Sequence, residues 1–302
     1  MEIASLELAD AGDLADVYNE QVAWVPHCYR TTPEEFEAAL HERTARDKHV
    51  KQLGSDKLLI GEENGTVIGF AHAATGELDV DGYQKRGGFI HFLTYRPGRR
   101  AVGQALLEAC ERHLDEARAE GLWAFQKFGG YPFYHLEFGN LSDRMGHVYA
   151  LFRVNGYEPD DGEVFLELRD LDVAEPAPYH PEVEVVVQQK AGRGARPGLE
   201  IRALRDDKQV AICDCGSAGD GSRADDAQDT FFVHWFGVEQ EAQGQGWGRY
   251  LLQRAQWEMQ QLGYRHAAIS TDWRNHRALL FYTNYGYRVT DTVYGLAKTA
   301  RE

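Results

Sequence analysis

The hydrophobic pattern of the first half switches between a two-residue period, typical of strands, and a 3.6-residue period, typical of helices. Leu106, Leu107, Cys110 and Leu114 form an apolar stripe that predicts a helix, and the Asn-Gly pair at 64–65 predicts a hairpin. The predicted elements are a strand at 2–7, helices at 10–21 and 32–46, strands at 57–62, 66–73 and 88–95, a helix at 102–120, a strand at 122–125, a helix at 148–154 and a strand at 163–168.

The second half repeats this order with one omission. Its predicted elements are strands at 183–187, 199–204, 209–215 and 231–238, a helix at 247–262, a strand at 267–271, a helix at 275–285 and strands at 287–291 and 292–298. The two helices within residues 10–46 have no counterpart between 188 and 198. The second half is therefore predicted to be a trimmed copy of the first.

A proline-rich segment separates the two halves. Pro176, Pro178 and Pro181 lie close together, and such a segment is stiff and extended. The sequence therefore predicts an N-terminal domain at 1–171, a linker at 172–182 and a C-terminal domain at 183–302.

One pair of segments shows the duplication most clearly. Phe89–Tyr95 is an apolar strand that leads into an Arg- and Gly-containing turn, and Phe232–Val238 leads into a Gly-rich turn. His91 and His234 hold the same place in the two strands. A repeat this long indicates a duplicated domain and not a solenoid.

The composition is that of a globular protein, with 43% apolar and 26% charged residues. No apolar run approaches the ~20 residues needed to span a bilayer, and the N-terminus lacks a signal-peptide pattern, so a cytoplasmic location is expected. The net charge of −16 argues against nucleic acid and against anionic membranes as partners. This charge either attracts cationic ligands such as amines or only keeps the protein in solution.

The four cysteines do not form a disulfide framework in a chain of this length. Cys213 and Cys215 share one face of a predicted strand. An isolated C-x-C pair is weak evidence for a metal, so we expect free thiols and no metal site.

The Gly-rich turn, residues 243–248, carries the first chemical signal. Its alternating glycines let backbone amides approach a phosphate, and the helix that follows adds its positive end. The turn lacks the Lys-Ser/Thr of a P-loop. It also lies late in the chain and not after a first parallel strand, which disfavours a dinucleotide fold.

The helix near the C-terminus carries the second signal. Asn275 and Tyr282 are two helical turns apart and share a face, and Gly286 supplies a left-handed cap. Taken alone, Tyr282 would more often be a core tyrosine.

Together the two segments resemble the GNAT acyltransferases, which use acetyl-CoA or another acyl-CoA. Gln243, Gly246 and Gly248 match the family's Gln/Arg-x-x-Gly-x-Gly/Ala turn. The later helix matches Asn-x-x-Ala-x-x-x-Tyr-x-x-x-Gly-Phe/Tyr at Asn275, Ala278, Tyr282, Gly286 and Tyr287. The resemblance implies a mixed α/β (α+β) fold in each half, with a mostly antiparallel sheet flanked by helices.

The resemblance also implies roles for individual residues. Val238 would pair with the pantetheine arm of CoA, Asn275 would touch that arm, and Tyr282 would protonate the leaving thiolate. His234 lies where the family often carries its base, although a buried structural histidine fits the sequence equally well. The pyrophosphate would be held by backbone amides of Gln243, Gly244, Gln245, Gly246, Trp247, Gly248 and Arg249.

The first half departs from the family pattern. Phe152 and Met145 stand where the second half has Tyr282 and Asn275, and only Tyr149, one turn earlier, could substitute for the missing hydroxyl. The N-terminal domain is therefore expected to be degenerate and the C-terminal domain catalytic. This layout resembles that of mycothiol synthase, but no motif ties the acceptor to that enzyme.

The expected activity is transfer of an acyl group, most simply acetyl, to a primary amine of a small molecule or peptide. A non-catalytic sensor that binds acyl-CoA is the alternative, and a duplicate that binds neither is a third reading. The sequence identifies neither the acceptor nor the oligomeric state.

Overall fold

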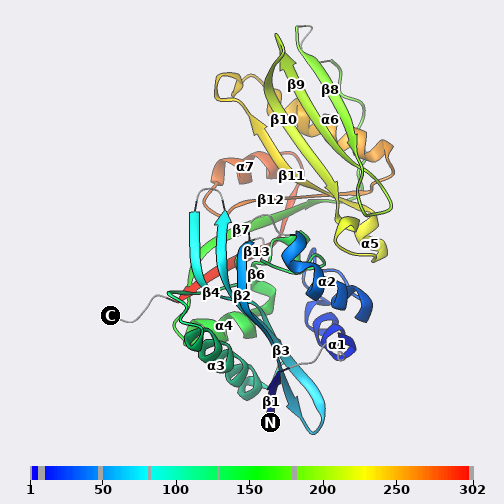
Figure 1. Cartoon of the computed structure of the whole chain (residues 1–302). Helices are drawn as coiled ribbons and strands as arrows, with labels where there is room; N and C mark the ends of the chain where they lie inside the picture. Colours follow the sequence, from blue (N-terminus) through cyan, green and yellow to red (C-terminus); the bar gives the residue numbers. More distant parts are fainter. Residues whose placement is uncertain are drawn as a thin grey trace. The chain divides into compact units, whose positions relative to one another are not determined.

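Figure 1 shows the computed structural model, which describes residues 2–5, 11–46, 50–80, 83–127, 129–178 and 182–298. The chain forms two compact units. Unit 1 comprises Met1–Val164, Asp272–Arg274 and Asp291–Glu302, and unit 2 comprises Phe165–Thr271 and Asn275–Thr290. Each unit is a sheet with helices, mostly antiparallel, which confirms the predicted fold class.

Unit 1 contains a sheet in the order β1-β2-β3-β4-β5-β13, in which only β4 and β5 are parallel. Its elements are β1 (Glu2–Ser5), α1 (Ala11–Val22), α2 (Pro33–Arg46), β2 (Val50–Glu63), β3 (Thr66–Val80), β4 (Tyr83–Tyr95), α3 (Arg100–Glu116), β5 (Leu122–Ala124), η2 (His135–Glu137), β6 (Leu141–Ser142), η3 (Asp143–Met145) and α4 (Gly146–Val154). Three strands, β7 (Glu158–Leu168), β12 (His266–Asp272) and β13 (Arg288–Lys298), contribute residues to both units.

Unit 2 contains a sheet in the order β7-β12-β11-β10-β9-β8, in which β11 and β12 are parallel. Its elements are β8 (Glu184–Lys190), β9 (Gly198–Arg205), β10 (Lys208–Ser217), η4 (Ala218–Asp220), α5 (Asp225–Gln228), β11 (Thr230–Val238), η5 (Gln240–Ala242), α6 (Trp247–Gln261), β12 (His266–Asp272) and α7 (His276–Asn284).

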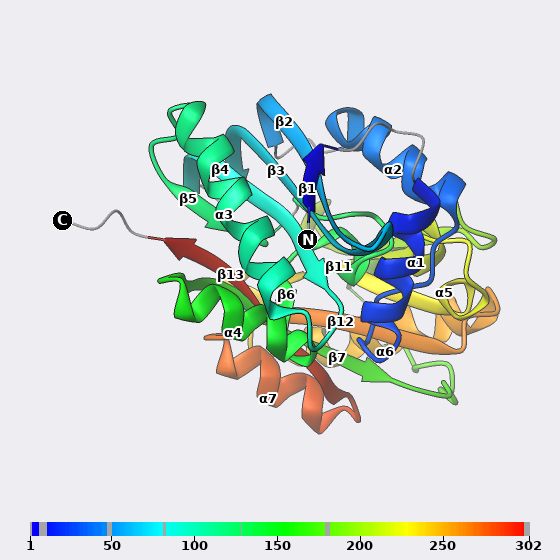
Figure 2. The same ribbon diagram turned by 90° about the horizontal axis from the view of Figure 1, so that it is seen from below.

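The sheet of unit 1 is covered on both faces. Figure 2 shows α1 and α2 on one side of β2–β4 and α3 on the other. From α1, Tyr18 packs its ring against Phe92 of β4 at 5.9 Å, and Phe36 of α2 packs against Phe70 of β3 at 5.6 Å. The buried side chains of α3 include the predicted stripe of Leu106, Leu107, Cys110 and Leu114.

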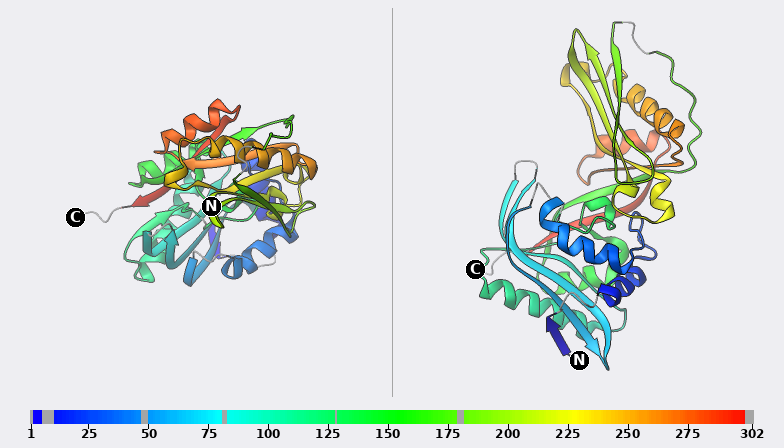
Figure 3. Two further views of the ribbon diagram at one scale, coloured as in Figure 1. Left: turned by 90° about the horizontal axis from the view of Figure 1, so that it is seen from above. Right: turned by 45° about the vertical axis from the view of Figure 1, so that its right-hand side comes forward.

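The sheet of unit 2 has α6 on one face (Figure 3). Apolar side chains of α6 are buried together with alternate residues of β9 and β10. These residues are Leu251, Leu252, Ala255 and Met259 from the helix, and Leu199, Ile201, Ala211, Cys213 and Cys215 from the strands. Residues 191–197 connect β8 to β9 without a helix, so this part of the chain has no counterpart of α1 and α2.

Polar contacts inside unit 1 hold the chain's last strand in place. The His135 imidazole contacts the carboxylate of Asp291 at 3.0 Å, and the Ser142 hydroxyl donates to the same oxygen at 2.7 Å. All three residues are buried. Residues 287–291 and 292–298, predicted as two strands, form instead the single strand β13. The prediction was wrong because Asp291 satisfies its charge inside the protein instead of marking a turn at the surface.

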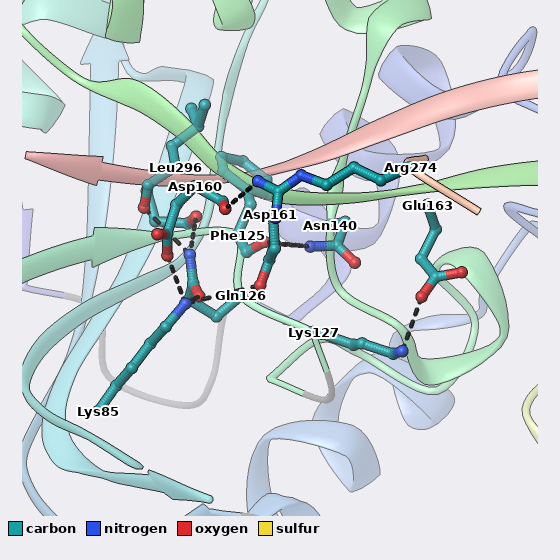
Figure 4. Close-up of polar contacts among 11 residues, drawn as sticks. Lys85, Phe125, Gln126, Lys127, Asn140, Asp160, Asp161, Glu163, Arg274 and Leu296 are labelled. Atoms are coloured by element: carbon teal, nitrogen blue, oxygen red, sulfur yellow. Dashed lines mark hydrogen bonds and ion pairs between the residues drawn. The ribbon is translucent and has the colours of Figure 1, made fainter. Parts of the chain in front are cut away.

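Figure 4 shows a second polar cluster of unit 1. Lys85 donates to the side-chain oxygen of Gln126 at 2.5 Å and pairs with Asp160 and Asp161. Gln126 in turn donates to the carbonyl of Leu296 in β13 at 3.1 Å. Burial raises the pKa of Asp161, while Lys85 beside it lowers that pKa. The ion pairs therefore link β4 to β7, and the Gln126 hydrogen bond links the segment after β5 to β13.

The compact units differ at their ends from the predicted domains 1–171 and 183–302. Residues 291–302 belong to unit 1, and residues 165–168 belong to unit 2. Within the predicted linker, residues 172–178 form neither helix nor strand. The Val173 carbonyl accepts a hydrogen bond from the Gln260 side chain of α6 at 3.4 Å. Residues 179–181 lie outside the described residues. As limits of the duplicated sequence, the predicted boundaries stay a prediction.

Candidate functional site

The parallel strands of unit 2 separate at their carboxyl ends. β11 and β12 pair from Thr230 with His266 to Val233 with Ile269. Beyond this point β11 continues to Val238, paired with β10 alone. Backbone groups on the side of β11 that faces away from β10 can therefore bind a ligand, because buried or half-buried peptide groups require partners.

His234 lies on a bulge at the point of separation. Asp214 of β10 pairs with Trp235 and Cys215 pairs with Val233, so His234 is an extra residue in β11. Unit 1 has the same bulge, since the partners of His72 and Ala73 skip one residue of β4. The skipped residue is His91, the sequence counterpart of His234.

The imidazole of His234 reaches solvent and leans over Gly216. A Cβ atom at Gly216 would overlap Nε2 of His234, and the Phe232 ring lies 5.3 Å away. The protein atoms crowded around the imidazole lower its pKa, while Asp214 raises it. The lowered pKa favours the neutral imidazole, which can accept a proton.

The acidic residues near His234 are engaged with other groups. Asp214 forms an ion pair with Lys190. Asp220 accepts hydrogen bonds from the backbone amides of Arg193 at 2.6 Å and Gly194 at 2.8 Å. Any attraction of cationic ligands by Asp214 and Asp220 is therefore weakened by these internal partners.

The Gly loop, residues 243–248, has the backbone that its sequence requires. Gly244 and Gly246 have φ angles of 76° and 87°, a region that favours glycine. Gly246 is the N-cap of α6, and no side chain caps this helix. Amides of a first helical turn lack intrahelical acceptors, so those of Gly248 and Arg249 suit an anion. The residues present fit a CoA pyrophosphate.

Two glutamine side chains brace this loop. Gln243 donates to the carbonyl of Val238 at 3.1 Å, and Gln245 donates to the carbonyl of Glu241 at 2.7 Å. A pantetheine arm that used the Val238 carbonyl would therefore have to displace the Gln243 side chain.

Helix α7 positions Tyr282 beside β11. Its ring lies 6.3 Å from that of Phe236 and 6.0 Å from that of Tyr287, and the residue is 6% exposed. Burial raises the pKa of the Tyr282 hydroxyl, and Cys213 adds to the increase. Among the described residues this hydroxyl makes no hydrogen bond, so its proton is available to a ligand.

Asn275 stabilises the N-terminus of α7. It is the N-cap of α7, and its side-chain oxygen accepts from the backbone amide of Ala278 at 3.1 Å. Its amide nitrogen and the second lone pair of the oxygen remain for the predicted contact with pantetheine.

The corresponding region of unit 1 is filled by its own side chains. The Tyr95 carbonyl, at the end of β4, contacts Nε2 of His147 at 2.9 Å. A Cβ atom at Gly103 would overlap the Tyr95 ring, so α3 is packed tightly against it. His91 is 5% exposed and contacts the Gly129 carbonyl at 3.1 Å, and Phe152 is fully buried.

Trp235 is a site residue that sequence reasoning missed. Its side chain is 63% exposed, next to His234. The only signal for it in the sequence was its alignment with Phe92, one residue after the shared histidine.

Comparisons with known proteins agree with this arrangement. Residues 201–289 match the family model described as an acetyltransferase (GNAT) domain. A tandem GNAT protein from the clavulanic acid biosynthesis pathway has a similar structure, with a TM-score of 0.68 and 12% identity over 100% of this chain and 99% of that one. A GCN5-related N-acetyltransferase from Sphaerobacter thermophilus has a TM-score of 0.58 and 14% identity over 98% and 95%.

A glucosamine N-acetyltransferase region of a fungal multi-domain β-N-acetylglucosaminidase is also similar, with a TM-score of 0.67 and 17% identity. This chain is covered to 98%, but spans only 38% of the fungal chain. No curated protein sequence matches. The fold is a tandem GNAT architecture. The chain carries a GNAT acetyltransferase domain in its C-terminal half.

Among the helices within residues 2–5, 11–46, 50–80, 83–127, 129–178 and 182–298, none combines the length and the hydropathy of a membrane span. Over the same ranges no group of three or more His, Cys, Asp or Glu side chains could hold a metal ion.

Proposed function

We propose that this protein is an acyl-CoA-dependent N-acyltransferase that transfers an acetyl group to a primary amine of a small molecule or peptide. The observation that carries the proposal is the uncapped, Gly-rich start of α6, which directly follows a strand that has separated from its parallel neighbour. This arrangement lies within the segment that matches the GNAT domain. A cytoplasmic location remains part of the proposal.

Residues of unit 2 would bind successive parts of the cofactor. Backbone amides from Gln243 to Arg249 would hold the pyrophosphate, with the positive end of α6 behind them. The free edge of β11, ending at Val238, would pair with the pantetheine arm, and the Asn275 amide nitrogen would donate to it. The N-terminal domain would contribute the fold without a second active site.

Acetyl-CoA supplies an acyl group as a thioester, whose carbonyl carbon a neutral amine can attack. His234 would accept the proton that the amine nitrogen loses as the C–N bond forms, directly or through water. A lowered pKa keeps the imidazole in the neutral, proton-accepting form at pH 7.

Tyr282 would act on the sulfur as the C–S bond breaks. Its raised pKa keeps the hydroxyl protonated throughout the neutral range. Complete transfer to a thiolate, whose conjugate thiol has a pKa of about 8.5, is uphill from such a phenol. The first contribution of Tyr282 would therefore be a hydrogen bond that stabilises the developing negative charge.

The competing proposal is a sensor that binds acyl-CoA without turnover. The full chain should be assayed for CoA thiol release with acetyl-CoA and a panel of amines, and for a thermal shift with acetyl-CoA alone. Amine-dependent thiol release supports the enzyme. A thermal shift without release supports the sensor, and neither response would exclude both.

A further inference from the structure

The face of the unit 2 sheet opposite α6 carries a row of polar residues that ends in an aromatic one. Paired registers across β8, β9, β10 and β11 align Gln188, Glu200, Asp214 and Trp235. Phe236, the next residue along β11, pairs instead with Cys213, which is buried on the α6 face. The row therefore lies on the opposite, open face.

The bulge places His234 on the same open face as Trp235. Gly216, two residues after Asp214 in β10, would direct a Cβ atom into the His234 imidazole. A Cβ atom at Gly237 would lie 3.3 Å from Nε1 of Trp235, so the indole extends over Gly237 toward the end of β11. The indole thus lies between the proposed base and the proposed pantetheine edge.

The corresponding position of unit 1 is covered by other side chains. Phe92 occupies the register of Trp235 in unit 1, directly after the bulged histidine, and is fully buried. The rings of Tyr18 and Tyr134 lie 5.9 Å and 5.1 Å from it. Unit 2 has no α1 counterpart among its described residues, and there the aromatic side chain is 63% exposed.

The two acidic members of the row are already neutralised in pairs. Asp214 pairs with Lys190, and Glu200 pairs with Arg202 at 3.1 Å. The four side chains are between 27% and 38% exposed, so their remaining donors and acceptors can reach a ligand. A long polycation would gain little from acids that are already paired. Hydroxyl groups could bond to both partners of each pair.

We propose that Trp235 is the platform on which the acceptor lies, and that this acceptor is an amino sugar. The sugar ring would stack its C–H face on the indole, its hydroxyls would meet the paired charges, and its amine would reach His234. This inference rests on the proposed function, because it names the acceptor of that same site.

The test measures steady-state kinetics of the full chain with acetyl-CoA and glucosamine, with spermidine and a lysine-containing peptide as rival acceptors. Trp235→Ala should raise the KM for glucosamine about tenfold, while kcat and the KM for acetyl-CoA stay within about twofold. Trp235→Phe should restore most of the affinity. Trp24→Ala, which removes another exposed indole (53%), should change nothing.

The outcomes separate the inference from the proposed function. Turnover of spermidine or peptide without glucosamine would overturn the inference and leave the N-acyltransferase intact. Glucosamine turnover with an unchanged KM in Trp235→Ala would also overturn it. If no amine is turned over, the proposed function fails. Calorimetric titration with glucosamine then tests the role of Trp235 separately. Equal affinity in the wild type and Trp235→Ala, or no binding in either, would overturn the inference as well.

Discussion

The two bulged histidines show how differently the two copies use one fold. His91 is buried and contacts a backbone carbonyl, whereas His234 reaches solvent beside an exposed indole. At the strand end of unit 1, His147 contacts the Tyr95 carbonyl, and at that of unit 2 the side chain of Gln243 donates to the Val238 carbonyl. The bulge is thus a property of the duplicated fold, and its surroundings decide whether it can serve chemistry.

The largest effect is expected from removing the proposed base. His234→Ala should lower kcat/KM by ~10²–10⁴-fold, the usual contribution of general base catalysis. The wild-type rate should fall at acid pH with a midpoint below about 6.5, because the imidazole pKa is lowered. This acidic limb should disappear in the variant. His91→Ala is the control: it should lower stability and leave the pH profile intact, and a loss of the limb there would break the comparison.

A smaller loss is expected at the proposed acid. Tyr282→Phe should lower kcat by ~10–10³-fold and leave acetyl-CoA affinity nearly unchanged, because the hydrogen bond forms with the developing charge. Phe152→Tyr, at the corresponding position of unit 1, should add no activity. Weaker acetyl-CoA binding with unchanged kcat would make Tyr282 a packing residue.

Repositioning the base without removing it should cost less. Gly216→Ala adds a methyl group where Nε2 of His234 now lies, so the imidazole must move. A displacement of this kind should lower kcat by about tenfold, within the range known for misplaced catalytic groups. In a His234→Ala background the same change should have almost no effect, and additive losses would show that Gly216 acts elsewhere.

The smallest effect is expected from alanine substitutions at two glycines with matched backbone geometry. Gly244 and Gly98 have φ angles of 76° and 84°, and a Cβ atom on either would meet nothing within 4 Å. Alanine at each position should therefore cost a similar ~1–2 kcal/mol of backbone strain. Only Gly244→Ala should raise the KM for acetyl-CoA, by roughly threefold to tenfold. Equal increases in the two variants would mean that both units hold the cofactor.

Much of this fold could be predicted because its signals are local. The apolar stripe of α3, the Asn-Gly hairpin and the glycines of the Gly loop act within a few residues of their own positions. The N-terminal cap of α2 is another example: the Thr32 hydroxyl accepts from the Glu35 amide at 3.2 Å, and the Glu35 carboxylate accepts from the Thr32 amide at 3.1 Å.

The features that the sequence did not reveal depend on distant partners. A bulge is defined by the facing strand, so strict alternation along β11 could not show that His234 and Trp235 share a face. The position of Asn275 in the sequence fits both a ligand contact and a helix cap. In the structure its side-chain oxygen accepts the capping hydrogen bond from the Ala278 amide. Asp291 resembles a turn residue until His135 and Ser142 are placed beside it.

The central claim is that only unit 2 binds acyl-CoA. It is tested most directly by calorimetric titration of the full chain with acetyl-CoA, since unit 1 contains residues 291–302 and cannot be isolated as residues 1–171 without losing a strand. We expect one equivalent bound per chain, with the affinity reduced in Gly244→Ala and unchanged in Gly98→Ala. Two equivalents, or one equivalent weakened only by Gly98→Ala, would contradict it.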